Sequence, residues 1–326
     1  MVISIVLAIL TYEFVEKKFS SRSFKPVSRL LFFNFILGVA GYLIFLNNGI
    51  PQRYPRHEEL LFSKESFKKS IKPFRKAGFC QEKFNNIEIC YIEEEIRSPT
   101  VALIGDSHAN HWFPGISEQL DDRENLLLLA KSGTPPILDV KSKRNPDTDL
   151  DDEIKYILST NSIHTVILSA FWSNYFEEKG TFVSGNFYKN SIYSPSLKSS
   201  DQNDIFKQQF EKMIKVLLAS NKRVIFFYDI PSLDFDLNSC LVRPLLKQHN
   251  TCIYDVSHEL EKQKGYRSII EPLIFKFKIL SFDPLNLICN SNDCLIKKNN
   301  NFIFSDSHHL SIWGSKELSK KLKLGI

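Results

Sequence analysis

Apolar residues form two kinds of pattern along the chain. Residues 1–15 and 30–46 are long apolar runs, whereas from residue 99 onward short apolar runs alternate with amphipathic segments. A membrane span needs roughly 17–25 mostly apolar residues, so the second run is long enough and the first is slightly short. We expect two transmembrane helices within residues 1–48. A buried core helix is the alternative for the second run. A signal peptide fits the first poorly, because no basic residue precedes it and no small-residue cleavage site follows.

The short apolar runs predict a parallel β-sheet. Five of them have strand length: 100–105, 125–130, 164–170, 223–230 and 277–282. Amphipathic helices are expected between them and at the end of the chain, at 151–161, 204–221 and 312–324, and residues 171–201 read as a long loop or hairpin. Strands alternating with helices give an α/β fold with a sheet covered on both faces. Active sites in such folds lie outside the carboxyl ends of the strands.

The distribution of charge predicts how the chain is oriented in the membrane. The net charge is +5, but basic and acidic residues are interleaved, which argues against a nucleic-acid partner. The stretch between the two long apolar runs carries five basic residues, Lys17, Lys18, Arg22, Lys25 and Arg29. A short loop this basic is expected in the cytoplasm. Residues 49–97 are then expected to form an extracytoplasmic linker, and residues 98–326 a domain outside the inner (cell) membrane, in the periplasm or extracytoplasmic space.

The six cysteines agree with that location. They form three local pairs in the sequence: Cys80 with Cys90, Cys240 with Cys252, and Cys289 with Cys294. Short loops between paired cysteines suit disulfides in an oxidising compartment. Free thiols are the alternative. A zinc site is disfavoured, because no Cys-x-x-Cys spacing occurs.

Two stretches contain candidate catalytic chemistry. The first expected strand runs into "IGDSHANHW", which includes Ser107, and the last expected helix follows "SDSHHLSIWGS", which includes Asp306 and His309. A serine nucleophile needs a base to take its proton, and that base needs a group to orient it. Each stretch alone is compatible with a simple turn. Together they predict a Ser-His-Asp triad whose members come from opposite ends of the domain.

The neighbouring polar residues are assigned other roles. Asp106 is expected to hold the turn before the nucleophile, and His108 is the alternative general base. His111 and His308 are expected to be non-catalytic. The histidine pairs lack a matching set of carboxylates, so no metal is expected.

These motifs resemble a known family. "IGDSHANHW" and "SDSHHLSIWGS" are similar to the first and last blocks of SGNH (GDSL-like) hydrolases, and "AKSGTPPI" and "VILSAFWSNY" resemble the middle blocks. More closely, the chain resembles the C-terminal part of a membrane-bound acyltransferase-3 O-acetyltransferase with a fused SGNH domain. "TYEFVEKKF" resembles the end of that family's tenth membrane helix, and "GIPQRYP" the segment after its eleventh. By this resemblance the chain begins inside the tenth helix, as a fragment, a split gene product or a stand-alone acceptor half.

The resemblance implies a three-layer αβα, flavodoxin-like SGNH domain and assigns roles. Ser107 is the nucleophile, His309 the general base and Asp306 its orienter. The oxyanion is held by the backbone N–H of Ser107, by Gly133 and by Asn174, although the family's Gly-x-Asn is replaced here by "AFWSNY".

The implied reaction is O-acetyl transfer to a cell-surface polysaccharide or lipopolysaccharide. No bound cofactor is expected, and acetyl-CoA is a distant donor that acts through an acyltransferase-3 membrane domain, upstream or in trans. The alternatives are a carbohydrate O-acetyl esterase and a non-catalytic glycan-binding module. The glycan, the hydroxyl, the acyl group and the oligomeric state do not follow from the sequence.

Overall fold

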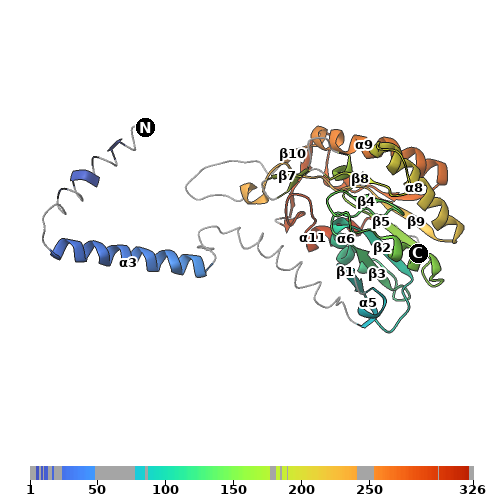
Figure 1. The fold of residues 1–326 in the computed structure, drawn as a ribbon, viewed down its shortest axis with the longest axis horizontal. Helices are drawn as coiled ribbons and strands as arrows, with labels where there is room; N and C mark the ends of the chain where they lie inside the picture. The colour runs from blue at the N-terminus through green and yellow to red at the C-terminus, as the bar shows by residue number, and fades with distance from the viewer. Residues whose placement is uncertain are drawn as a thin grey trace. The chain divides into compact units, whose positions relative to one another are not determined.

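The structure is a computed structural model, and it divides the chain into two compact units, Met1–Pro55 and Arg56–Ile326 (Figure 1). Each unit is described by itself. The residues described are 5–6, 9, 11–13, 17, 24–47, 78–84, 87–176, 181–183, 186–188, 190–240, 253–299 and 301–322.

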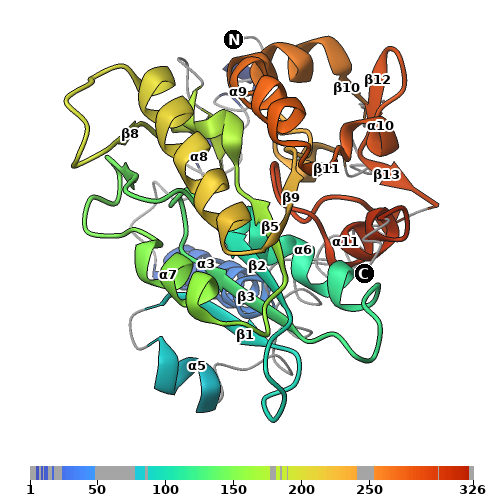
Figure 2. The ribbon, with the colours of Figure 1, turned by 90° about the vertical axis from the view of Figure 1, so that its right-hand side faces the viewer.

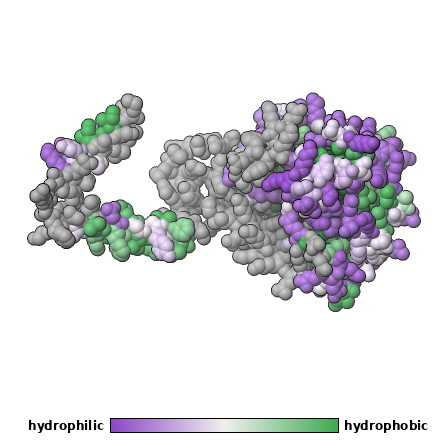
Figure 3. All heavy atoms as spheres, in the orientation of Figure 1, coloured by the Kyte–Doolittle hydropathy of each residue, from purple (hydrophilic) through white to green (hydrophobic). Residues whose placement is uncertain are grey.

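The first unit is described mainly through one helix, α3, which spans Phe24–Leu46. Its described apolar side chains are exposed, Phe45 to 76%, and they are the green surface along α3 in Figure 3. No helix among the described residues reaches the length and apolarity needed to cross a membrane. The first predicted span falls largely outside the described residues, and both spans stay a prediction.

The second unit is built on a six-stranded sheet with the order β1-β3-β2-β5-β9-β11. The strands are β1 (Ile89–Ile92), β2 (Val101–Gly105), β3 (Leu126–Ala130), β5 (Thr165–Ser169), β9 (Arg223–Phe227) and β11 (Leu280–Phe282). All neighbours pair in parallel except β1 with β3. Without β1 the order is 2-1-3-4-5, that of flavodoxin-like folds. The five predicted strands and the parallel sheet are therefore confirmed.

Helices cover both faces of this sheet, as Figure 2 shows. One face carries α7 (Asp151–Ser159), α8 (Gln202–Ala219) and α9 (Val256–Phe277), and the other carries α6 (Ser107–Ser117) and α11 (Ile312–Ser319). Successive strand residues point to opposite faces. Ala102 and Ile104 accordingly belong to the first core, and Val101 and Leu103 to the second. Both cores need apolar side chains, which is why the strands read as continuous apolar runs.

Smaller elements surround the sheet. They are α5 (Gly78–Lys83), β4 (Lys141–Ser142), the 3₁₀ turns η3 (Trp172–Tyr175) and η4 (Leu237–Cys240), β6 (Thr181–Val183), β7 (Asn186–Tyr188), β8 (Ile192–Tyr193), β10 (Ile253–Asp255), α10 (Leu285–Ile288), β12 (Asp293–Leu295), β13 (Lys297–Lys298) and β14 (Asn301–Phe302). The antiparallel pair β6–β7 confirms the hairpin expected within 171–201. β11 is shorter than the predicted 277–282, because α9 continues to Phe277 and ends at Lys278 with a left-handed φ of 52°.

The predicted boundary at residue 98 is too late. Residues 49–97 were interpreted as a linker, yet β1 pairs antiparallel with β3 and completes one edge of the sheet. Cys90 and Ile92 are buried in the core, whereas Ile89 and Tyr91 are only partly buried. A four-residue edge strand with one buried face has too weak an apolar pattern to stand out in a polar stretch.

Two of the predicted disulfides are present. Cys80 of α5 is bonded to Cys90 of β1, and Cys289 is bonded to Cys294. The first bond joins α5 to the edge strand. Cys252 lies outside the described residues, so the predicted pairing with Cys240 stays a prediction.

Candidate active site

Ser107, His309 and Asp306 form one hydrogen-bonded line. His309 Nε2 lies 2.9 Å from Ser107 Oγ, and His309 Nδ1 lies 2.8 Å from Asp306 Oδ2. Both distances are those of good hydrogen bonds. The imidazole therefore has one nitrogen on the hydroxyl and the other on the carboxylate, which is the arrangement that lets a histidine accept a serine proton.

The packing of α6 against α11 brings these distant residues together. Gly115 of α6 lies so close to α11 that a Cβ there would be 2.2 Å from the Ser315 carbonyl oxygen. Ser315 Oγ accepts the Gly115 N–H at 3.0 Å and contacts the Trp112 carbonyl oxygen at 3.3 Å. Ser311 caps α11, and Ser305 N donates to the His309 carbonyl oxygen at 2.8 Å. The loop that carries Asp306 and His309 is thus fixed beside the start of α6.

The charge state of the pair favours a general base. Burial alone would raise the pKa of Asp306, but the His309 imidazolium and the hydrogen bonds from His309 and His308 hold it well below its usual range. Burial would lower the pKa of His309, but the Asp306 carboxylate outweighs this and raises it. Asp306 therefore stays ionised and stabilises the positive charge that His309 gains when it takes a proton.

Asp106 is a structural clamp, as predicted for the turn, and it reaches further than the turn. Its Oδ1 accepts the His108 N–H at 2.8 Å, which caps α6. Its Oδ2 accepts the Phe171 N–H at 2.9 Å and the Tyr175 hydroxyl at 3.0 Å. Burial raises the pKa of Asp106 to about 6, although these donors pull it down. The clamp joins the nucleophile turn to the segment after β5.

Asp229 is a second clamp on the same segment, and the sequence analysis missed it. It follows β9, is 1% exposed, and accepts the N–H groups of Trp172 at 2.9 Å and Ser173 at 2.8 Å. Burial raises its pKa to about 8 despite those donors. Trp172 packs in the core with its indole N–H on the Phe227 carbonyl oxygen at 2.8 Å. An aspartate at the carboxyl end of a predicted strand was the available signal.

One cavity of about 340 Å³ is lined by the predicted nucleophile, general base and oxyanion residues, whereas Asp306 is not among its lining residues. Its lining residues are Asp106, Ser107, Ser132, Gly133, Arg144, Asn145, Phe171, Asn174, His308 and His309. Asn174 lies in η3, which the two aspartates clamp, so it reaches the cavity without the usual Gly-x-Asn motif. Arg144, Asn145 and Ser132 were not predicted.

Gly133 lies in a tight turn from Lys131 to Thr134. The Thr134 N–H donates to the Lys131 carbonyl oxygen at 3.1 Å, and Gly133 has a φ of +64°. Glycine is favoured at such a position because a side chain there is strained. Its carbonyl oxygen accepts from Asn190 Nδ2 at 3.1 Å. Gly133 and Ser107 line the same cavity, and the role of the Gly133 N–H as an oxyanion donor stays a prediction.

Three further histidines surround the triad. His108 and His308 are 1% and 8% exposed, and both are stacked on Phe171, with ring centroids at 4.2 and 5.2 Å. Burial lowers the pKa of His108 and His111 well below the usual range and that of His308 to about 3; repulsion from His309 adds to the effect. Within the described residues, His108 Nε2 has no hydrogen-bond partner, and the histidine ring that hydrogen-bonds to Ser107 Oγ is that of His309.

The histidines are also the one potential metal-ligand group among the described residues. One ligand atom each from His108, His308 and His309 lies within 4.8 Å of the others. Both ring nitrogens of His309 already bond to Ser107 and Asp306. The triad and a metal would therefore compete for the same imidazole.

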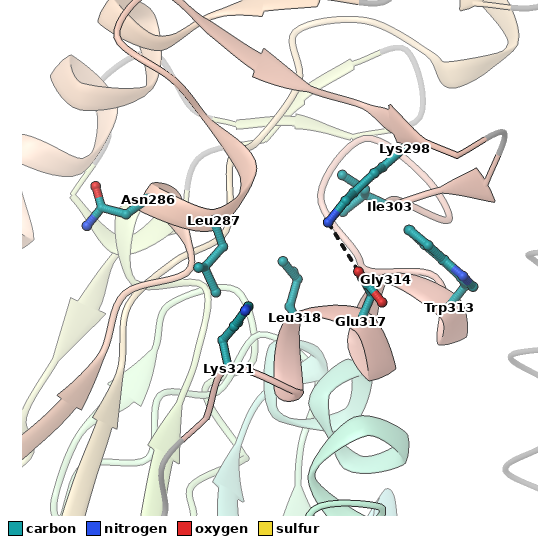
Figure 4. A pocket seen from close by; sticks show the side chains of 9 residues that line it. All are labelled: Asn286, Leu287, Lys298, Ile303, Trp313, Gly314, Glu317, Leu318 and Lys321. Carbon is teal, nitrogen blue, oxygen red and sulfur yellow. Dashed lines mark hydrogen bonds and ion pairs between the residues drawn. The ribbon is translucent and has the colours of Figure 1, made fainter.

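A second cavity, of about 200 Å³, contains none of the predicted site residues. Figure 4 shows Leu287, Leu318 and Lys321 directed toward one another, and an ion pair of 3.1 Å between Lys298 and Glu317. Its lining includes no serine, cysteine or histidine, so the first cavity is the candidate active site.

Fold and site together define a class: an α/β domain with a serine triad at the carboxyl ends of a flavodoxin-like sheet. The model of the family described as "SGNH domain (fused to AT3 domains)" matches residues 77–323, and the chain belongs to this family. The match begins just before α5, in agreement with the corrected boundary.

Similar solved structures have low sequence identity. The periplasmic domain of a lipopolysaccharide acetyltransferase from Salmonella ser. Paratyphi A is 17% identical over 69% of this chain and 82% of that one, with a TM-score of 0.49. An acylhydrolase from Bacteroides fragilis is 11% identical over 70% and 89%, with a TM-score of 0.38. A GDSL-like lipase from Bacteroides thetaiotaomicron is 11% identical over 80% and 100%, with a TM-score of 0.36. No curated protein matches the chain.

Proposed function

We propose that this domain transfers an acetyl group through Ser107 to a hydroxyl of a cell-surface polysaccharide or lipopolysaccharide. The observation that carries the proposal is the continuous hydrogen-bonded line from Ser107 Oγ through His309 to Asp306. Ser107 and His309 line a cavity together with Gly133 and Asn174, the other two residues that we propose as oxyanion donors. Membership of a family of SGNH domains fused to AT3 domains directs this chemistry toward acyl transfer.

In the first half-reaction His309 Nε2 takes the Ser107 proton while Oγ attacks the acyl carbonyl carbon. The resulting oxyanion accepts hydrogen bonds from the N–H groups of Ser107 and Gly133 and from the Asn174 amide. Collapse breaks the bond to the leaving group, which takes the proton from His309, and an acetyl-serine remains.

In the second half-reaction an acceptor hydroxyl gives its proton to His309 and attacks the acetyl carbonyl carbon. A second tetrahedral intermediate uses the same donors. Collapse releases the acetylated glycan, and the proton returns from His309 to Ser107 Oγ. Water in place of the glycan hydroxyl gives acetate. The His309 side chain is 22% exposed and Ser107 is partly exposed, so water can reach the acyl-enzyme, which favours this esterase reaction as the second candidate function.

We also propose the compartment, the membrane anchor and the partner of this domain. The disulfides Cys80–Cys90 and Cys289–Cys294 suit an oxidising, extracytoplasmic compartment. Residues 1–48 would anchor the domain to the inner membrane. An acyltransferase-3 membrane domain would pass the acetyl group from cytoplasmic acetyl-CoA to Ser107, because moving charged groups through hydrocarbon needs a protein-lined path.

The test uses the full chain, an isotopically labelled activated acetyl ester and purified surface polysaccharide. Label on the glycan together with a labelled acetyl-serine at residue 107 supports transfer, whereas label released only as acetate selects the esterase. Ser107→Ala should abolish both. Turnover that persists in Ser107→Ala would overturn the proposal.

The proposed acetyl donor and its membrane partner are tested in inside-out vesicles whose only added protein is this chain. Labelled acetyl-CoA is added on the cytoplasmic face, and the lumenal glycan is analysed. We expect no transfer until an acyltransferase-3 domain is co-expressed. Transfer by this chain alone would refute the proposed partner.

A further inference from the structure

We propose that Asn145 is a positioning residue that fixes the direction of the Gly133 N–H, one of the oxyanion donors. The inference rests on the proposed function, since it concerns how that site stabilises an oxyanion. Asn145 Nδ2 donates to the Ser132 carbonyl oxygen at 2.9 Å. That carbonyl and the Gly133 N–H belong to the same peptide unit.

The peptide that Asn145 holds is the central one of the turn. Lys131 and Thr134 close the turn, so Ser132 and Gly133 are its two middle residues. A φ of +64° at Gly133 is the type II arrangement, and type I differs mainly by a flip of this central peptide. Glycine tolerates both signs of φ, so the residue that makes the turn possible does not by itself select its orientation.

A flip would reverse the catalytic donor. The N–H and C=O of a trans peptide point in opposite directions. If the Ser132–Gly133 peptide flips, the Gly133 N–H leaves the oxyanion position and the Ser132 carbonyl oxygen replaces it. An acceptor there repels an oxyanion. The hydrogen bond from Asn145 stabilises only the type II orientation, and it also polarises the peptide so that its N–H donates more strongly.

The other contacts of the turn do not provide this control. Glu88 accepts the Ser132 N–H at 2.8 Å and the Ser132 hydroxyl at 2.7 Å, which fixes the preceding peptide and the side chain. Asn190 Nδ2 donates to the Gly133 carbonyl oxygen, which belongs to the following peptide. Among the described hydrogen bonds, that from Asn145 is the one made to the central carbonyl.

A matched control lies on the same loop. Thr148 Oγ1 is 3.0 Å from Thr134 Oγ1 and also 3.0 Å from the Asn145 carbonyl oxygen, so it ties the same loop to the same turn. It does not touch the Ser132–Gly133 peptide and does not line the cavity. Thr148→Ala therefore loosens the loop without freeing that peptide.

The experiment measures hydrolysis of a small acetyl ester by the full chain, with the affinity of a boronic acid that forms a tetrahedral adduct on serine. Asn145→Ala should lower kcat about 10- to 100-fold, with little change in KM, and weaken boronate binding by a similar factor. Thr148→Ala should stay within about threefold in both. Equal losses in the two variants, or unchanged boronate affinity in Asn145→Ala, would show that Asn145 only supports the loop.

Two further variants separate positioning from folding. Asn145→Asp keeps the size, but its ionised carboxylate repels the Ser132 carbonyl, so its activity relative to wild type should rise as pH falls and the carboxyl becomes a donor. Gly133→Ala disfavours the positive φ, and its loss should not add to that of Asn145→Ala, because both free the same peptide. Losses of Asn145→Ala and Gly133→Ala that add in the double variant count against the proposal. So does a ratio of Asn145→Asp to wild-type activity that does not change with pH.

Ser107→Ala is measured in the same assay. Loss of activity in Ser107→Ala with full activity in Asn145→Ala overturns this inference alone. Full activity in Ser107→Ala overturns the proposed function itself.

Discussion

The tripeptide Asp-Ser-His occurs twice in this protein, at residues 106–108 and 306–308, and its two copies do different work. Both begin with the same local turn: the N–H of His108 bonds to Asp106 Oδ1 at 2.8 Å, and that of His308 to Asp306 Oδ1 at 2.9 Å. Local sequence therefore explains the shared turn but none of the differences.

The differences lie in the second carboxylate oxygen and in the serine. Asp106 Oδ2 faces the buried Phe171 N–H and Tyr175 hydroxyl, whereas Asp306 Oδ2 faces the His309 ring. Ser107 opens into the cavity, whereas Ser307 is 5% exposed with its hydroxyl 3.1 Å from His308 Nδ1. The comparison teaches that a motif of three reactive residue types acquires its chemistry from what packs against it.

The largest expected effect separates the two serines. Ser107→Ala removes the nucleophile and should reduce kcat for a small acetyl ester by about 10³-fold or more. Ser307→Ala removes one hydrogen bond near the site and should reduce it less than about tenfold. Steady-state kinetics of both variants, with circular dichroism to verify folding, provides the measurement. Comparable losses of kcat in the two variants would contradict the different roles assigned to Ser107 and Ser307.

The next effect separates the adjacent histidines. His309→Ala removes the base and should cost about 10²- to 10⁴-fold in kcat. His308→Gln keeps a polar side chain in the cavity wall and leaves the Ser107–His309 hydrogen bond intact, so a loss below about tenfold is expected. The same ester assay measures kcat of both variants. A loss of kcat that is greater in His308→Gln than in His309→Ala would identify His308 as the base.

A third effect separates the two aspartates through pH. The Asp306 carboxylate raises the pKa of His309, and His309 must be neutral to accept a proton. Wild-type kcat/KM should therefore rise with pH, with a midpoint above the ordinary histidine value of about 6.5. Asp306→Asn removes the charge that raises this pKa, so the midpoint should move to lower pH and the plateau should fall about 10²- to 10⁴-fold.

Asp106→Asn should mainly lower the plateau of kcat/KM at high pH and the stability of the protein. An amide places an NH2 group, which only donates, where one carboxylate oxygen accepted, so the contacts to Phe171 and Tyr175 weaken and Asn174 is held less firmly. Asp106 also contributes to the raised pKa of His309, but less than Asp306 does, so we expect a midpoint shift to lower pH that is smaller than that of Asp306→Asn. We also expect a lower plateau and a reduced melting temperature. A midpoint shift as large as that of Asp306→Asn would place Asp106 in the proton-transfer unit.

The smallest effect concerns the disulfide Cys289–Cys294, which precedes the second tripeptide in the chain. Cys289 and Cys294 belong to the region around α10 and β12, not to the cavity wall. The paired variant Cys289→Ser/Cys294→Ser should change kcat less than about threefold and mainly lower the melting temperature, by an amount set by a short loop. Non-reducing peptide mapping of native protein should show the bond itself. Free thiols at both positions would contradict the extracytoplasmic assignment.

Several elements were predictable because their signals are local. β2, β3, β5 and β9 are continuously apolar, since each is buried on both faces. The helix after Ser311 follows a recognisable cap. α9 lacked such a signal: its buried positions include Glu259 and Gln263, and it contains Gly265 and Pro272, so its apolar period is weak. β1 was missed because its apolar run, ICYI, is only four residues long and is flanked by acidic residues.

The sequence by itself determined the residue types of the site, their order along the chain and the alternation of strands and helices that places both tripeptides at loop-to-helix junctions. Only the tertiary structure decided which aspartate orients a base and which clamps a backbone segment. It also decided that Asp229 holds the turn of Asn174 and that Asn145 holds the peptide of Gly133. The physical reason is that these roles depend on single hydrogen bonds between segments far apart in the chain. The local sequence pattern cannot predict such hydrogen bonds. They form because α6 packs on α11 and because the parallel sheet brings distant segments together.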